Sequence, residues 1–96
     1  MSAKKQLELT ERAFRNIAAA EEYIAKDKPA AAQKVVKAIY NTAEKLETFP
    51  EMGRPGRVPG TRELPLVEYP YTLIYRIKAT RVVVYAVLHQ SRLYPS

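Results

Sequence analysis

The 96-residue sequence contains no cysteine and no tryptophan, and it has a single histidine. Without cysteine neither a disulfide nor a thiolate zinc site can form, so a reducing cytoplasm is the expected location. With one histidine, carboxylates would have to supply nearly every metal ligand, so no metal or other cofactor is expected. No apolar run approaches the ~20 residues that cross a bilayer. Residues 1–5 also lack the apolar core of a signal peptide, so no membrane contact is expected.

A chain of this length is expected to form one domain, residues 1–96, around one hydrophobic core. Its composition, 47% hydrophobic and 27% charged, is that of a globular protein. Glycine is scarce as well, and all three glycines fall in residues 50–60 together with three prolines, which predicts a loop there.

The net charge is +6, and the positive charge is unevenly distributed. Residues 1–50 mix nine Lys or Arg with seven Asp or Glu, as on a solvated helix surface, whereas residues 51–96 carry seven against three. These seven are Arg54, Arg57, Arg62, Arg76, Lys78, Arg81 and Arg92. Arginine forks match phosphate and carboxylate geometry, so this half predicts a basic face for a polyanion or an acidic partner.

Two helices are predicted from caps and apolar spacing. The first is expected from an N-cap at Thr10 to about Ala25. Its buried stripe is expected at Phe14, Ile17, Ala20 or Glu21, and Ile24. The second is expected to begin at Pro29 and to end before Pro50. Its stripe is expected at Ala32, Val35, Val36, Ile39, Ala43, Leu46 and Phe49. The short connection between the two helices predicts an antiparallel hairpin.

Alternating residues predict a short first strand at 5–9, and three further strands at 61–66, 69–78 and 81–89. The expected fold class is α+β. An N-terminal strand is followed by an antiparallel helical hairpin, which packs on one face of a small, mostly antiparallel four-stranded sheet (β-α-α-β-β-β).

The last strand is apolar on both faces over 82–88, which predicts a central strand covered on both sides. Two helices can cover only one face. We therefore expect the tail 90–96, a second copy of the chain in a homodimer, or a partner to cover the other face. This expectation includes an exposed apolar patch on the isolated monomer. Alternation places Thr72, Ile74, Arg76 and Lys78 on the open face. Arg62 could join them from the neighbouring strand, whose register a single sequence does not give.

The order of strand, helical hairpin, glycine–arginine loop and three-stranded sheet resembles the RelE/ParE toxins of type II toxin–antitoxin systems, and the resemblance covers nearly the whole chain. Its local marks are Pro29 to Ala32, Phe49-Pro50, Gly53-Arg54, Arg62-Glu63-Leu64, Tyr71 to Tyr75, and Leu88-His89 with Arg92 and Pro95. The resemblance implies a growth-inhibiting toxin of a plasmid-stabilization type, held inactive by a cognate antitoxin. The antitoxin would lay an acidic, partly helical segment over the open face and its basic rim.

Proteins of this superfamily fall into two functional classes. One consists of ribosome-dependent endonucleases that cut mRNA, and the ParE-like class poisons DNA gyrase and cuts nothing. The endonucleases typically carry an arginine in the motif aromatic-Arg-Leu-Val-Tyr, where this chain has Thr72. A hydroxyl cannot replace a delocalised positive charge at a developing anion. This departure favours the ParE-like class, with DNA gyrase as the target and without enzymatic activity.

The alternative is an mRNA endonuclease acting on the ribosome. RNA cleavage through the 2′-hydroxyl needs a base, cationic donors and an acid. His89 could serve as base or acid, Arg62, Arg76 and Arg92 could hold phosphate, and Tyr94 could stack on a base or donate a proton. A plain nucleic-acid-binding module is a third interpretation, which explains the charge but not the half-covered sheet.

The residues expected to contact the target or the antitoxin are Arg54, Arg57, Arg62, Ile74, Arg76, Lys78, His89, Arg92 and Tyr94. Several have structural explanations of equal or greater weight. His89 can anchor the tail through hydrogen bonds, and the sheet tyrosines can serve packing alone.

Overall fold

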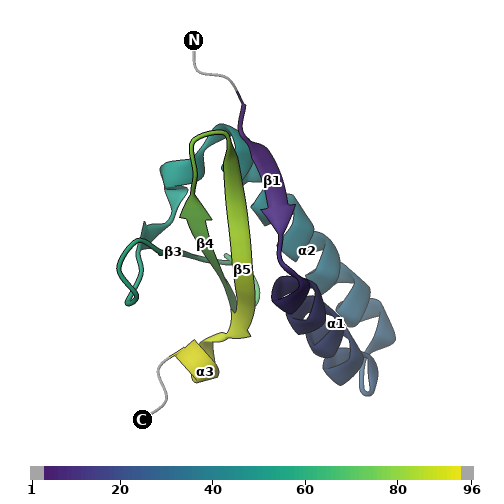
Figure 1. Ribbon diagram of the computed structural model, residues 1–96. Helices are drawn as coiled ribbons and strands as arrows, with labels where there is room; N and C mark the ends of the chain where they lie inside the picture. The colour runs from purple at the N-terminus through teal and green to yellow at the C-terminus, as the bar shows by residue number, and fades with distance from the viewer. Residues whose placement is uncertain (1–3, 94–96) are drawn as a thin grey trace.

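Five strands form one mixed sheet in the order β1-β5-β4-β3-β2, and a helical hairpin covers one of its faces (Figure 1). The computed structural model describes residues 4–93. The strands are β1 (Gln6–Leu9), β2 (Arg54–Pro55), β3 (Arg62–Pro65), β4 (Tyr71–Ile77) and β5 (Arg81–His89). The helices are α1 (Glu11–Ala25), α2 (Pro29–Thr48) and the short α3 (Gln90–Leu93), with a 3-10 turn η1 (Pro50–Met52). The predicted α+β fold is confirmed. Its sheet gains a fifth, two-residue strand from the segment expected to be loop.

The strand β1 is parallel to β5, and every other pairing is antiparallel. As predicted, β5 is an interior strand, with β1 on one side and β4 on the other. The β4–β5 register shifts between Ile74, which faces Ala86, and Tyr75, which faces Val84, so Tyr85 is an extra residue on β5. Such a bulge reverses which side chains of the strand face the helices from that point on.

Local signals define the helix ends. The Thr10 hydroxyl accepts a hydrogen bond from the Ala13 amide at 3.1 Å, which caps α1. The same hydroxyl donates to the Tyr85 carbonyl at 2.9 Å, so the cap also ties α1 to the sheet. Pro29 opens α2 at a position where its missing N–H is not needed.

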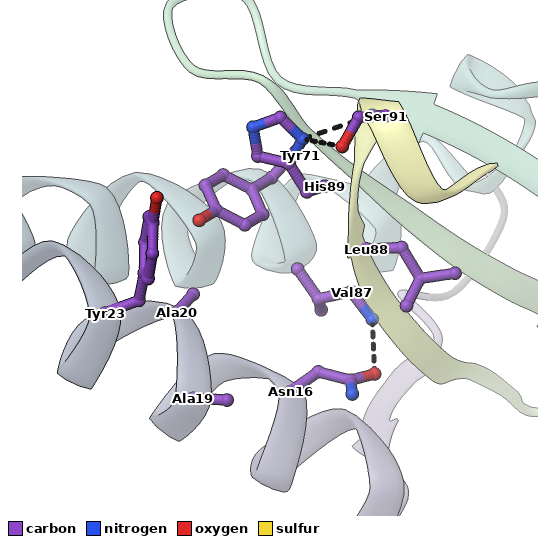
Figure 2. Close-up of a pocket in the computed structure, with 9 residues that line it drawn as sticks. All are labelled: Asn16, Ala19, Ala20, Tyr23, Tyr71, Val87, Leu88, His89 and Ser91. Carbon is purple, nitrogen blue, oxygen red and sulfur yellow. Dashed lines mark hydrogen bonds between the residues drawn. The ribbon is translucent and has the colours of Figure 1, made fainter. Parts of the chain in front are cut away.

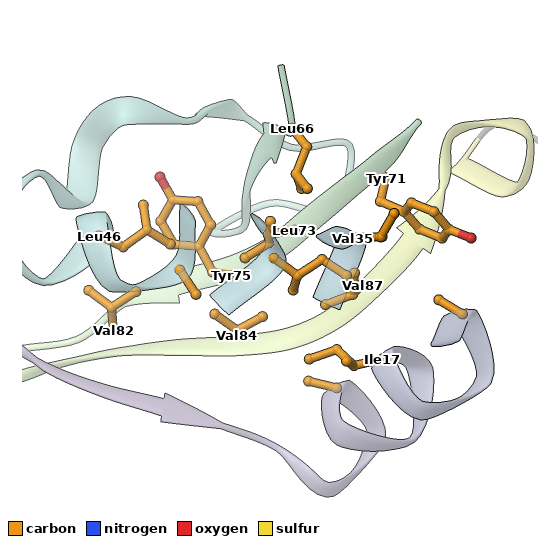
Figure 3. Close-up of a cluster of buried hydrophobic side chains, with 14 residues drawn as sticks. Ile17, Val35, Leu46, Leu66, Tyr71, Leu73, Tyr75, Val82, Val84 and Val87 are labelled. Carbon is orange, nitrogen blue, oxygen red and sulfur yellow. The ribbon is translucent and has the colours of Figure 1, made fainter. Parts of the chain in front are cut away.

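The core lies between the helices and one face of the sheet (Figure 3). Leu73 and Tyr75 of β4 and Val82 and Val84 of β5 point into it, and Ile39 lies among the residues that α2 contributes. Each fully buried aliphatic side chain of this kind stabilises the fold by about 1.5–3 kcal/mol. The prediction that the tyrosines of β4 serve packing is confirmed for Tyr75, which is fully buried.

Two aromatic residues expected in the helix stripes lie outside the core. Phe14 is 50% exposed and Phe49 is 61% exposed. The buried positions of α1 are Ala13, Ile17 and Ala20. The bond from the cap to Tyr85 fixes the rotation of α1, so that Ala13 rather than Phe14 faces inward. Phe49 is the C-cap residue of α2, and its φ of −124° and ψ of 67° take its side chain off the helical stripe.

Across residues 4–93, the helices fall short of the length and apolarity needed to cross a membrane.

Candidate interaction surface

The sheet face opposite the helices is called the outer face here. It is bordered by a basic loop, residues 54–61, which comprises β2 and the turn that leads to β3. Arg54 lies directly opposite Glu63 in the β2–β3 register. Its Nη2 is 3.6 Å from Glu63 Oε1. The other carboxylate oxygen accepts a hydrogen bond from the Arg57 amide at 3.2 Å. Glu63 is only 5% exposed, so one buried carboxylate contacts two arginine residues of the loop.

The segment before this loop is held from the helix side of the sheet by Tyr75. The Tyr75 hydroxyl accepts a hydrogen bond from the Gly53 amide at 2.9 Å and donates one to the Pro50 carbonyl at 2.6 Å. A Cβ at Gly53 would lie 2.6 Å from that hydroxyl oxygen. Glycine is therefore required where the chain crosses the tyrosine ring.

The expectation that Arg62 joins Arg76 on the outer face is wrong. Arg62 pairs with Tyr75 in the β3–β4 register and so shares its face, on the helix side rather than beside Arg76. Its Nε donates to the Gly53 carbonyl at 3.1 Å and its Nη2 to the Glu51 carbonyl at 3.3 Å. Arg62 thus binds backbone oxygens of the turn that follows α2.

Arg76 lies on the outer face, as predicted, with its guanidinium carbon 5.9 Å from the centroid of the Tyr85 ring. The tip of the basic loop reaches it, because a Cβ on Gly60 would collide with Arg76 Nη1. Gly60 has φ of +87°, which other residues rarely adopt. Ile74, also on the outer face, is half-buried opposite Glu63.

Lys78 follows β4 in the turn to β5 and is exposed. Its backbone amide donates to the Arg81 carbonyl at 2.8 Å. The tight turn expected at Ala79-Thr80 is therefore present, and Lys78 lies where β4 enters it, at the end of the sheet remote from His89.

The outer face is not the bare apolar surface expected from the sequence. Thr72, Val83 and Ala86 all lie on it and all are buried. Arg76 is the direct cross-strand partner of Val83, and at that spacing the aliphatic stem of an arginine can cover its neighbour. Alternation correctly identified the face of these residues. It does not predict how much of a small side chain is covered by longer side chains on neighbouring strands.

His89 lies on the helix side of the sheet, opposite Tyr71 at the start of β4 (Figure 2). Because of the bulge at Tyr85, His89 faces the same way as Tyr71, and their rings meet edge to face at 5.3 Å. The two rings border a cavity of about 440 Å³ between α1 and the end of β5. It is lined by Asn16, Ala19, Ala20, Tyr23, Tyr71, Val87, Leu88, His89 and Ser91.

Hydrogen bonds determine which nitrogen of His89 carries the proton. Nδ1 accepts from the Ser91 amide at 3.1 Å and lies 2.8 Å from the Ser91 hydroxyl. In the neutral ring the amide bond engages the Nδ1 lone pair, which places the proton on Nε2. These bonds are local, because Ser91 lies only two residues after His89, and they agree with the structural alternative given for His89.

The residues expected for RNA cleavage are not brought together. Arg62 pairs with Tyr75 and His89 pairs with Tyr71. Four residues along a strand separate these positions by about 13 Å. Arg76 lies on the other face of the sheet. Arg92 falls within α3, but its side chain, like Tyr94, lies outside the described part of the chain.

Sequence reasoning missed the anchors of the basic loop. The residues expected at the contact surface do not include Glu63, and the sheet tyrosines are expected to serve packing alone. The available signal was an acidic residue in an otherwise apolar strand directly after an arginine-rich loop. Asn16, a polar residue on the inner side of α1, was also missed, and its Oδ1 accepts from the Val87 amide at 3.1 Å (Figure 2). Within residues 4–93 no three His, Cys, Asp or Glu residues cluster as a metal site would require.

Residues 7–94 match the family described as "ParE toxin of type II toxin-antitoxin system, parDE". A curated protein of Sinorhizobium fredii named "Putative toxin Y4kP" is 39% identical over 93 residues, covering 97% of this chain and 96% of that protein.

Among solved structures, a chain of the chromosomal ParDE toxin–antitoxin system from P. aeruginosa matches with a TM-score of 0.84 at 25% identity, over 92% of this chain and 98% of that one. The toxin–antitoxin complex RelBE2 from Mycobacterium tuberculosis contains a chain that shares the fold, with a TM-score of 0.66 at 23% identity, over 93% and 94% of the two chains. The chain therefore belongs to the ParE toxin family of type II toxin–antitoxin systems, within the RelE/ParE superfamily.

Proposed function

We propose that this toxin arrests bacterial growth by binding and poisoning DNA gyrase in the cytoplasm, without cutting RNA, and that a cognate antitoxin neutralises it. The observation that carries the proposal is the state of Thr72. This residue occupies the position where the endonucleases typically carry an arginine. It is 0% exposed, and its hydroxyl has no hydrogen-bond partner.

A fully buried hydroxyl cannot contact a phosphate at the surface. Catalysis of phosphoryl transfer depends on charged donors placed about 3 Å from the oxygens where charge develops. Thr72 provides neither the charge nor the exposure, which supports a toxin that acts by binding.

The dispersal of the other candidates supports the same proposal. A general base must lie within hydrogen-bond reach of the proton it removes. His89 uses Nδ1 to bind Ser91, while Arg62 binds backbone carbonyls about four strand residues away along β4.

The proposed contact surface for gyrase is the basic loop and the neighbouring part of the outer face. Arg54 and Arg57 are exposed, and Arg76 lies beside the loop tip. Ile74 supplies a half-buried apolar centre among these cations. Arginine with a buried apolar neighbour is the composition typical of protein-binding hot spots.

The antitoxin proposal rests on charge and on the solved relatives. The P. aeruginosa structure is of a toxin–antitoxin system, and the M. tuberculosis structure is of a toxin–antitoxin complex. A net charge of +6 favours an acidic partner, which associates faster with a positive surface. We expect such a segment to cover the same basic loop.

The test uses the full-length chain made by cell-free synthesis, which avoids selection against a toxic product. Purified gyrase should lose supercoiling activity as the chain is added. Arg76→Gln should require about tenfold more protein for the same inhibition, which corresponds to ~1.4 kcal/mol. Arg15→Gln is the matched control, because Arg15 is exposed on α1 and pairs with Glu11 at 3.0 Å, remote from the outer face.

Two outcomes would contradict the proposal. Normal growth of bacteria that express the folded chain would exclude a toxin. New 5′ ends in ribosome-bound message, detected by primer extension and abolished by His89→Ala, would establish the endonuclease instead.

A further inference from the structure

Two consecutive residues of β3 hold the chain that connects α2 to β3 from opposite faces of the sheet. On the helix side, Arg62 donates to the carbonyls of Gly53 and Glu51. On the outer face, Glu63 contacts Arg54 through one carboxylate oxygen and the Arg57 amide through the other. Alternation along a strand makes this possible, because adjacent residues point to opposite faces.

The burial of Glu63 makes its contacts with the loop important for stability. A carboxylate removed from water is destabilising unless charged or hydrogen-bonding partners replace the solvent. The contacts of Glu63 named here both come from the loop segment that begins at Arg54. If the loop moved away, the carboxylate would lose these contacts while remaining on β3 beside β4. The buried charge therefore favours one position of the loop.

That position determines how the cations of the loop stand relative to Arg76. Gly56, beside the carboxylate, donates its amide to the Thr61 carbonyl at 2.8 Å and closes the loop. Gly60, at the other end of the loop, touches the Arg76 guanidinium. We infer that Glu63 is a positioning residue, whose charge holds the β2–β3 loop so that Arg54, Arg57 and Arg76 form one surface for the target. This inference rests on the proposed function.

A positioning role for Glu63 and recognition of net charge alone predict opposite effects of Glu63→Gln on inhibition. Glu63→Gln removes one negative charge from a basic surface. If the target recognised net charge alone, the variant would associate faster and inhibit more strongly. If Glu63 positions the loop, the variant inhibits less. The loop is then ordered only when the target binds, and the entropy lost in ordering it weakens binding.

The experiment compares Glu63→Gln with Glu8→Gln. Glu8 pairs with Arg81 at 3.2 Å, and both side chains are about half exposed. It faces Val83 on the same outer face, but on β1, at the far edge of the sheet. Both variants change the charge by one, and only the first touches the loop. The assay is run at a temperature at which circular dichroism shows wild type and both variants to be folded. We expect the Glu63→Gln concentration that inhibits gyrase supercoiling to be about tenfold higher than that of wild type. Glu8→Gln should match the wild type.

Hydrogen exchange provides the readout that does not depend on gyrase. The Arg57 and Gly56 amides should exchange at least about tenfold faster in Glu63→Gln and at unchanged rates in Glu8→Gln. If wild type fails to inhibit gyrase, the proposed function is wrong, and the exchange rates still decide the role of Glu63. Unchanged exchange, or inhibition by Glu63→Gln equal to or stronger than wild type, would overturn the inference.

A second variant covers the case in which Glu63→Gln does not fold. In Gly56→Ala the new Cβ would collide with the Thr61 hydroxyl oxygen and lie 3.3 Å from Glu63 Oε2. This variant displaces the loop while keeping the carboxylate. It should show the same loss of inhibition, and retained potency would count against the positioning role.

Discussion

Removing the hydroxyl of Tyr75 should destabilise the protein out of proportion to the single atom lost. Tyr75 is 0% exposed, and its hydroxyl serves both the Gly53 amide, at 2.9 Å, and the Pro50 carbonyl, at 2.6 Å. In Tyr75→Phe the ring still packs in the core, so the hydrophobic contribution is retained. The change isolates the two hydrogen bonds that hold the turn between α2 and the basic loop.

The magnitude follows from the burial of the two groups. A buried donor or acceptor left without a partner costs about 1–3 kcal/mol. The Gly53 amide bond is buried and the Pro50 carbonyl bond is partly buried, so we count the first fully and the second in part. The expected loss is about 2 kcal/mol, a large part of the ~5–15 kcal/mol by which a domain is stable. For a chain of this size the melting temperature should fall by roughly 10 °C.

Urea unfolding followed by circular dichroism measures this loss, and the slope with urea should stay unchanged because the same surface is exposed. Tyr23→Phe is the matched control. Tyr23 is 74% exposed, so its variant should remain within about 0.5 kcal/mol of wild type. A Tyr75→Phe midpoint indistinguishable from that of Tyr23→Phe would refute the anchoring role of the hydroxyl.

Two further predictions concern single hydroxyl groups. Thr72→Val, a change of nearly equal volume, should leave stability unchanged or raise it by about 1 kcal/mol, because the buried Thr72 hydroxyl has no partner. A loss above ~1 kcal/mol in the same urea assay would mean that the hydroxyl is bonded. Thr10→Ala should cost about 1–2 kcal/mol, since Thr10 both caps α1 and donates to the Tyr85 carbonyl. Thr10→Ser keeps the oxygen and should recover most of that loss; equal losses in the two variants would show that the methyl group, not the hydroxyl, matters.

The helices were predictable because their signals are local. Thr10 and Pro29 are end signals within one turn of the helices they begin. The faces of β4 were predictable for the same reason, since alternation of Leu73 and Tyr75 depends only on the strand itself. The apolar stripe of α2 repeats over several turns, so one misassigned position, Phe49, does not change which face of the helix is predicted to be buried.

The site was less predictable because it depends on contacts between distant segments. The face of Arg62 follows from its pairing with Tyr75, and the place of His89 follows from the bulge at Tyr85. Neither register can be predicted from the residues of one strand alone. Phe14 lies outside the core because Thr10 bonds to Tyr85, 75 positions further along the chain. The two-residue strand β2 forms only because Glu63 and Arg62 offer it an edge.

We propose that this ParE-family toxin acts by binding gyrase through its basic loop and outer face. The decisive experiment titrates purified gyrase with the folded chain and measures DNA supercoiling. We expect supercoiling to decline with added wild-type chain and Arg76→Gln to shift the titration to about tenfold higher concentration. Supercoiling that stays constant at every concentration, while ribosome-bound message is cut, would contradict this proposal.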